Sequence, residues 1–359
     1  MNRDVVIGHI IKKVDYTCYG RWIIDFIIQN DEIDAIKDIM KRHGYIENCS
    51  IAIECMHFED IQAWVKQNVN PNTYGAFCLI KLLEYDYENA YSIIIQKADP
   101  NNYYGNYSLN KVFEKVELPS SIIDKVDPNT EYGSLFCIKY IDNCRIQQLI
   151  LDKAEVDNRY GSNSLIELYE KGSKKALDKL FKESDENSDI GSKNFIAIRH
   201  EELALRYILN NVYPSNIHGY AIYQALADDG CEKAILKIAN PNEEKGCNQL
   251  CELVKEGCTE AADVILFCAS LNTEFGAKCL ILLSDFGNTL AIDIINNTDS
   301  LSKTAKDALI HLKNSGKLSL NGEMQLRLID ETFTNRQNNF IKTDVDLHAS
   351  SDKYLRDDP

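Results

Sequence analysis

Apolar residues recur along the chain at fixed distances from a series of glycines. Eight of these glycines are spaced 27–30 residues apart: Gly75, Gly105, Gly133, Gly161, Gly191, Gly219, Gly246 and Gly276. Gly20 lies two periods before this series, with Asn48 near the missing position, and Ala305 stands where the next glycine would fall. Large apolar residues usually follow four and seven residues later, as Leu109 and Val112 follow Gly105. Residues three apart share a helix face, so the pattern predicts a short helix after each glycine.

A second helix is predicted in each period. A further glycine often follows eleven residues after the first, where it would end the first helix: Gly172, Gly230, Gly257, Gly287 and Gly316. Alanine is common at the fifteenth position, where a second helix could approach its neighbour closely: Ala35, Ala90, Ala176, Ala234, Ala261 and Ala291. Aliphatic runs such as QQLILDK at 147–153 follow. The chain is therefore predicted to be all-α, a solenoid of about ten short helix-turn-helix repeats of 27–30 residues.

The segment before each glycine reads as a turn. It is spelled ADPNNYYG at 98–105 and VDPNTEYG at 126–133. Proline fixes φ, and Asn or Asp bonds its own backbone, so both favour a turn. The glycine would then either adopt a positive φ or allow neighbouring backbone to approach.

These features resemble the ankyrin repeat. GCTEAADVILFCASLN at 257–272 and GCEKAILKIANPN at 230–242 echo its glycine, its second helix and its Asx-containing turn. The resemblance covers residues 14–331 and implies stacked helix pairs with a partner-binding concave edge. The T-P-L-H tetrapeptide is missing, and the period is shorter than 33 residues, so shortened or absent β-hairpins are expected. A generic helical-hairpin solenoid is the alternative. Residues 1–13 are expected to form an N-terminal cap, and residues 332–359 a polar C-terminal tail.

Composition narrows the classes of function. The formal charge is −16, from 55 acidic and 39 basic residues. Direct nucleic-acid binding is not expected, because it requires a cationic surface. A protein partner with a basic surface fits better. The sequence shows no signal peptide and no run long enough to cross a membrane. The 12 cysteines are therefore expected to be reduced, and the protein to be cytoplasmic in the producing or host cell.

No familiar catalytic or nucleotide-binding motif occurs, so neither a catalytic residue nor a cofactor is expected. The best metal candidate is Cys247, Cys251 and Cys258, with Cys231 or Cys279 as a further ligand. Cysteine also serves as a small buried apolar residue at repeat positions. That interpretation is preferred, so no metal is predicted.

Tyrosine often precedes the repeat glycine, and equivalent positions of a repeat array lie along one edge. Such a row would provide large contact areas with polar tips. Neighbouring aromatic residues add to it. The candidate partner-binding residues are Tyr19, Trp22, Tyr74, Phe77, Tyr104, Tyr107, Tyr132, Tyr160, His218 and Tyr220. Asn106 is also expected to be exposed. The alternative interpretation is that the rings stack on one another and stiffen the turns.

The sequence therefore predicts a noncatalytic protein-binding scaffold that uses its turn edge. The Ile-, Asn- and Lys-rich composition suggests an AT-rich genome. One hypothesis is therefore a viral or intracellular-microbe protein that sequesters or inhibits a host defence factor. The alternatives are a small-ligand, nucleotide or enzyme site in the groove, and a self-assembling structural protein, since homo-oligomers are compatible with exposed stack ends.

Overall fold

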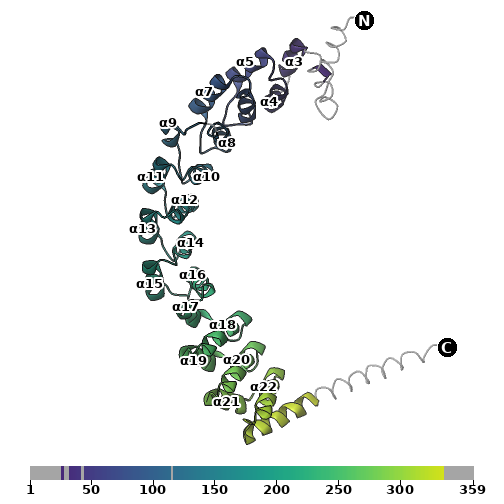
Figure 1. The fold of residues 1–359 in the computed structure, drawn as a ribbon. Helices are drawn as coiled ribbons and strands as arrows, with labels where there is room; N and C mark the ends of the chain where they lie inside the picture. Colours follow the sequence, from purple (N-terminus) through teal and green to yellow (C-terminus); the bar gives the residue numbers. More distant parts are fainter. Residues whose placement is uncertain (1–25, 28–31, 42–43, 115, 335–359) are drawn as a thin grey trace, which may run out of the picture. The chain divides into compact units, whose positions relative to one another are not determined.

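The computed structural model describes residues 26–27, 32–41, 44–114 and 116–334, and every regular element in these ranges is helical (Figure 1). The chain divides into two compact units, Met1–Ile198 and Arg199–Pro359. The predicted cap at 1–13, with Tyr19 and Trp22, lies outside the described residues. The helices of the first unit are α3 (Ile33–Met40), α4 (Tyr45–Glu54), α5 (Glu59–Asn68), α6 (Ala76–Leu82), α7 (Tyr87–Lys97), α8 (Tyr103–Val112), α9 (Ser120–Ile123), α10 (Glu131–Lys139), α11 (Cys144–Lys153), α12 (Arg159–Glu170), α13 (Lys174–Glu183) and α14 (Asp189–Ala197).

The second unit continues the same alternation of helices. It contains α15 (Glu202–Asn211), α16 (Ile217–Asp228), α17 (Glu232–Ile238), α18 (Glu244–Lys255), α19 (Thr259–Cys268), α20 (Glu274–Asp285), α21 (Thr289–Asn296), α22 (Lys303–Asn314) and a last helix over 320–334. The first residues of the segment expected as a tail are thus helical, and the remainder lies outside the described part. No helix that the structure describes is long and apolar enough to cross a membrane.

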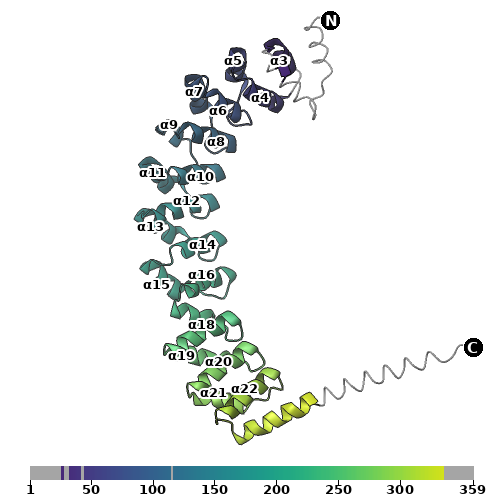
Figure 2. The same cartoon turned by 45° about the vertical axis from the view of Figure 1, so that its right-hand side comes forward.

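Helices of successive repeats pack against one another in chain order within each unit. In the first unit α4 contacts α6, α6 contacts α8, α10 contacts α12 and α12 contacts α14, while α5 contacts α7 and α11 contacts α13. In the second unit α18 contacts α20 and α20 contacts α22, and α17 contacts α19. In Figure 2 the even-numbered helices α6, α8, α10, α12 and α14 of the first unit form one row. The odd-numbered helices α5, α7, α9, α11 and α13 form a second row beside it. This arrangement is repeat-like, as the periodicity predicted.

The predicted core positions are buried. Leu79, Leu109, Leu165 and Leu280, four residues after their glycines, have no exposed surface. The second-helix alanines are equally inaccessible at Ala90, Ala176, Ala234, Ala261 and Ala291. Burying a large aliphatic side chain contributes about 1.5–3 kcal/mol. The repeated leucines and small alanines therefore supply both the driving force and the close approach of successive helix pairs.

The glycines predicted to separate the two helices have the expected backbone. Gly172 has φ of 91°, and the same left-handed conformation occurs at Gly230, Gly257, Gly287 and Gly316. The Gly172 N–H donates a hydrogen bond to the Tyr169 carbonyl at 2.7 Å, and the Ser173 N–H donates one to the Leu168 carbonyl at 3.2 Å. This pair of bonds is the Schellman motif, which ends a helix with glycine in the left-handed region.

The glycines at the start of each period have a different role. None of those described has a positive φ. Instead, a Cβ placed on Gly133 would lie 1.9 Å from the Asp127 carbonyl oxygen, and one on Gly105 would lie 2.2 Å from that of Asp99. Of the two roles open from sequence, the structure therefore selects close approach to the preceding turn.

Asparagines of the turns connect one repeat to the next. The Asn101 amide nitrogen donates to the Lys125 carbonyl at 2.8 Å, and its oxygen accepts from the Asp127 N–H at 2.7 Å. Asn129 bonds Lys153 and Glu155 in the same way, at 2.9 and 2.8 Å. We call each such pair of bonds an asparagine bridge. Asn72 and Asn242 make the same bridge, and Asn296, the last residue of α21, makes an equivalent pair of bonds to Lys317 and Ser319.

Replacing a bridging asparagine should destabilise the fold. We expect Asn101→Ala to lower the free energy of unfolding by about 1–2 kcal/mol, because the hydrogen bonds of its side chain with Lys125, Asp127 and Thr130 of the next repeat are lost. Asn101→Asp should cost at least as much, because a carboxylate oxygen would then face the Lys125 carbonyl oxygen and the Asp99 carboxylate in place of the amide donor. Urea denaturation followed by circular dichroism measures both effects. Asn163→Ala, on the exposed face of α12, is the matched control, and an equal cost there would contradict the bridging role.

Candidate protein-binding edge

Five aromatic residues from three successive repeats form a continuous row in the first unit. Ring centroids are 5.1 Å apart for Tyr74 and Phe77, and 6.1 Å for Phe77 and Tyr104. Tyr103 then contacts Tyr104 at 5.0 Å and Tyr132 at 5.5 Å. Most of these pairs are edge-to-face, the geometry that ring quadrupoles favour. We call these residues the aromatic row. The structure thus brings together four of the predicted site residues.

Tyr103 was missed by the sequence reasoning. It lies two residues before the repeat glycine, whereas the predicted tyrosines lie one residue before it. Its ring is 49% exposed, yet it joins Tyr104 to Tyr132 of the next repeat. The doubled tyrosine in ADPNNYYG was the available signal.

Hydrogen bonds to the turns fix the helices that carry the row. The Asn102 side chain accepts from the N–H groups of Tyr104 and Gly105 at 2.9 and 3.2 Å, which caps α8. The Thr130 hydroxyl accepts from the Gly133 N–H at 3.1 Å and caps α10. These caps satisfy helix N–H groups that would otherwise be unpaired. Tyr103, Tyr104 and Tyr132 therefore project from the capped first turns of α8 and α10.

A groove of about 510 Å³ lies along the row. Its lining consists of uncharged residues: Tyr45, Ile46, Asn72, Thr73, Tyr74, Asn101, Asn102, Tyr103, Tyr104 and Tyr132. The Tyr45 hydroxyl accepts from the Asn70 N–H at 2.9 Å and lies 3.1 Å from the Thr73 hydroxyl, so its ring is held at the groove. The groove offers mainly ring faces and edges to whatever occupies it.

Phe77 of the row and its neighbours Asn106 and Tyr107 are less exposed than the sequence suggested. Phe77 contacts Tyr107 at 5.4 Å between ring centroids, and both rings are half-buried. The expectation that Asn106 is exposed is wrong. Asn106 is buried, and its amide donates to the carbonyls of Pro100 at 3.0 Å and Tyr132 at 2.6 Å. It holds the Tyr132 backbone rather than a partner.

Electrostatic interactions connect Tyr132 of the aromatic row to Tyr160 of the next repeat. Burial raises the pKa of the Tyr132 hydroxyl, and the negative charges that Glu131, Tyr103 and Tyr160 can carry raise it further. Tyr132 therefore stays a neutral hydrogen-bond donor at neutral pH. Tyr160 therefore lies close enough to influence the ionisation of Tyr132. The described residues show no ring contact between these two tyrosines.

The remaining predicted residues, His218 and Tyr220, lie on α16 in the second unit. His218 is half-buried and Tyr220 is 44% exposed, and the neighbouring Ile217 is 79% exposed. They belong to a different unit from the aromatic row and are not part of its groove.

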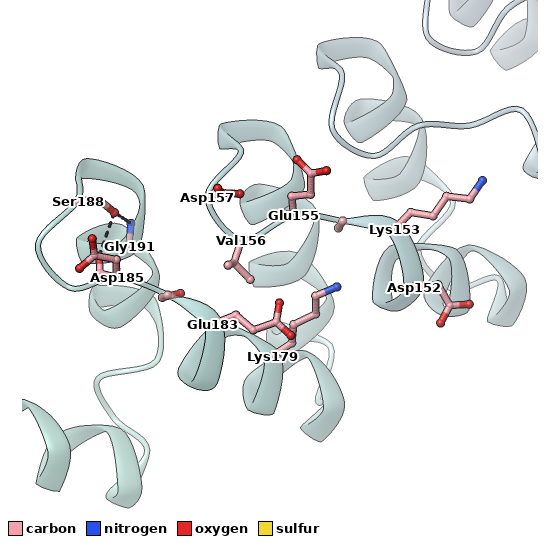
Figure 3. A pocket seen from close by; sticks show the side chains of 12 residues that line it. Asp152, Lys153, Glu155, Val156, Asp157, Lys179, Glu183, Asp185, Ser188 and Gly191 are labelled. Carbon is pink, nitrogen blue, oxygen red and sulfur yellow. Dashed lines mark hydrogen bonds between the residues drawn. The ribbon is translucent and has the colours of Figure 1, made fainter.

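A second cavity of the first unit, about 610 Å³ in volume, is acidic. Two successive turns and the ends of α11 and α13 form it, as Figure 3 shows. Its charged residues are Asp152, Lys153, Glu155, Asp157, Lys179, Glu183 and Asp185. Lys179 donates to the Leu151 carbonyl at 2.9 Å. Five carboxylates against two ammonium groups favour a cationic occupant.

This cavity lies where the series of asparagine bridges is interrupted. Asp157 occupies the bridging position, but a carboxylate has no N–H to donate, and its side chain makes no bond to the next turn within the described structure. Asn194, which is fully buried, ties this region together instead. Its amide nitrogen donates to the Val156 carbonyl at 3.0 Å and the Ser184 hydroxyl at 2.8 Å. Its oxygen accepts from the Ser162 hydroxyl at 2.5 Å.

The predicted cysteine group is divided between two places. Cys247 and Cys251 lie together with Cys279, all three buried. Cys258 instead lies beside Glu232 and Glu260 at the surface, with its Sγ 3.1 Å from a Glu232 carboxylate oxygen. Grouping Cys258 with Cys247 and Cys251 was therefore wrong. The third thiol comes from the following repeat.

Comparison with known proteins gives no family for this chain: no protein-family model matches it, and no curated protein is similar to it.

Proposed function

We propose that this protein is a noncatalytic protein-binding scaffold of the ankyrin-like helical-solenoid type, and that a basic segment of its partner binds along the aromatic row. The solenoid assignment is supported by helix pairs packed in chain order and by the left-handed glycines between paired helices. The described residues contain no strand, in keeping with β-hairpins that are reduced to turns.

The observation that carries the proposal is the continuity of the row across three repeats. Tyrosine combines a large rigid contact area with a polar tip, and such residues are enriched at the centres of protein interfaces. Ring faces also attract Arg and Lys side chains, each contact contributing about 0.5–2 kcal/mol. The net charge of −16 and the acidic cavity in the same unit favour the same kind of partner.

A protein segment fits the groove better than a small ligand does. Small-molecule sites usually present a few free polar groups that fix the ligand. Here the amides of Asn72 and Asn101 are both engaged in asparagine bridges, and the lining carries no charge. The polar groups left in the lining are mainly tyrosine hydroxyls distributed along an extended surface of rings, which supports recognition of a longer chain. Sequestration of a host factor is a narrower form of this proposal that rests on composition alone.

Selection of binders from a random peptide library shows directly which peptide sequences the aromatic row prefers. We expect peptides that bind the protein to be enriched in Lys and Arg. Tyr104→Ala should weaken their binding by about 30-fold or more, because a central interface aromatic contributes about 2 kcal/mol or more. Titration calorimetry on the selected peptides measures the change.

The matched control is Tyr91→Ala. Tyr91 stacks on Tyr87 at 5.8 Å between ring centroids, on α7 and outside the groove. It should leave peptide affinity unchanged. Equal binding by the Tyr104→Ala protein, or selection of neutral and acidic peptides, would count against the proposal. A thermal shift caused by nucleotides would favour a small-ligand site instead.

A further inference from the structure

Three buried thiols from two successive repeats converge in the second unit. The Sγ atoms of Cys247 and Cys251, both on α18, are 3.9 Å apart. The Sγ of Cys279 on α20 lies 3.8 Å from that of Cys251. The exposed fractions are 0% for Cys247, 7% for Cys251 and 0% for Cys279. All three sulfur atoms lie within 4.8 Å of one another.

The repeat register explains how two of these thiols meet. Cys247 directly follows one repeat glycine, and Cys279 lies three residues after the next. In the first unit the same two positions hold Ser134 and Ser164, whose hydroxyl oxygens are 2.8 Å apart. Ser162 and Asn194 occupy the same two positions and are also hydrogen-bonded, so these positions face each other in more than one pair of adjacent repeats. The second unit adds a third thiol, Cys251, one helical turn after Cys247.

The spacing matches a thiolate-bound metal ion. Zinc binds cysteine sulfur at about 2.3 Å in a tetrahedral site, so two sulfur ligands of one ion lie about 3.8 Å apart. The Sγ–Sγ distances from Cys251 to Cys247 and to Cys279, 3.9 and 3.8 Å, agree with this value. Three thiolates leave one tetrahedral position unfilled by protein.

A small cavity reaches one of the three thiols. It has a volume of about 210 Å³, and Cys251 is part of its lining. Lys255 and Lys278 line it as well, together with Glu252 and Asp285. The cavity gives an ion a path to the thiols and leaves room for a water molecule as fourth ligand. Lys255 is ion-paired with the Glu252 carboxylate at 2.6 Å, so Lys278 is the ammonium group that offsets part of the negative charge of a three-thiolate zinc centre.

We propose that Cys247, Cys251 and Cys279 form a zinc site with three thiolate ligands and an exchangeable fourth position that faces this cavity. The ion connects α18 to α20, and therefore two successive repeats. Binding replaces the thiol protons, which are released to solvent.

Zinc binding to the full, reduced chain tests the site. Titration against a chromophoric zinc indicator should give one tightly bound zinc per chain, and cobalt(II) should produce sulfur-to-cobalt charge-transfer absorption. Cys251→Ser and Cys279→Ser should each weaken zinc binding by about 100-fold or more, because one of three ligands is lost. Cys78→Ser is the matched control, since the buried Cys78 thiol donates to the Cys49 backbone carbonyl at 3.2 Å in the first unit and belongs to no group of three possible ligands among the described residues. It should leave the affinity unchanged.

A second measurement applies if a serine variant does not fold. Zinc should protect Cys251 of the wild-type protein from alkylation, as mapped by mass spectrometry. Lack of one-to-one binding by the folded wild type, or alkylation of Cys251 at an unchanged rate in saturating zinc, would overturn the proposal. So would loss of binding in Cys258→Ser alone, which would place the ion at the surface group of Glu232, Cys258 and Glu260.

Discussion

Gly133→Ala should lower the free energy of unfolding by about 3 kcal/mol or more, because the added methyl group has no space. Its Cβ would lie 1.9 Å from the Asp127 carbonyl oxygen and 2.5 Å from the Asn101 amide oxygen. The first atom belongs to the backbone, and the second is held in an asparagine bridge, so neither moves easily. Alanine is the better helix former by about 1 kcal/mol, and this gain is smaller than the expected loss. Urea denaturation measures the change.

Gly172→Ala is the comparison that measures backbone strain without a steric clash. Gly172 has φ of 91°, and its Cβ would meet no atom within 4 Å. Only the left-handed backbone then opposes alanine, at about 1–2 kcal/mol. Gly133→Ala should therefore be clearly the more destabilising of the two. The reverse order would show that the repeat glycines are not kept small by the preceding turn.

Asn194→Ala should be comparably destabilising, at about 3 kcal/mol. It removes three buried hydrogen bonds, to Val156, Ser162 and Ser184. A hydrogen bond contributes about 1 kcal/mol, and a buried group left without a partner costs more. The turn at 154–157 should also exchange its amide hydrogens faster, because its only side-chain connection to the next repeat in the described structure is lost.

A double-mutant cycle identifies the origin of that effect. Ser162→Ala combined with Asn194→Ala should cost less than the sum of the single variants, because both remove the same hydrogen bond. Asn163→Ala, next to Ser162 but exposed on α12, should add independently to Asn194→Ala. Strict additivity of Ser162→Ala and Asn194→Ala would contradict the buried network.

The helix pairs were predictable because repetition averages out local ambiguity. A single apolar spacing such as Leu109 and Val112 is weak evidence, but the same spacing in successive periods decides the helix face. The breaks at Gly172 and its equivalents followed for the same reason. Contacts between repeats were not predictable in this way. Asn101 reads as an ordinary turn residue, and only the stacked structure shows that its amide bonds the next turn.

In the candidate sites, too, features within one repeat were predictable from the sequence and contacts between repeats were not. The row of tyrosines before the glycines was visible in sequence, whereas the contact of Tyr103 with Tyr132 required the register between repeats. Likewise, Cys247 and Cys251 share a helix face by their spacing alone. The third thiol could be assigned to Cys279 rather than Cys258 only after α18 and α20 were placed side by side.

Deletion of one whole repeat tests the central claim, that each repeat is held chiefly by its neighbours. Removal of residues 127–154 takes out 28 residues, the spacing from Gly133 to Gly161, and joins Val126 to Glu155. Asn101 would keep its bond to the Lys125 carbonyl and could accept from the Glu155 N–H, which Asn129 binds in the intact chain. We predict unchanged helicity per residue by circular dichroism and cooperative urea unfolding. The shorter deletion 127–140, which removes α10 and leaves α11 unpaired, should lose both. Equal disruption by the two deletions would contradict a stack of interchangeable repeats.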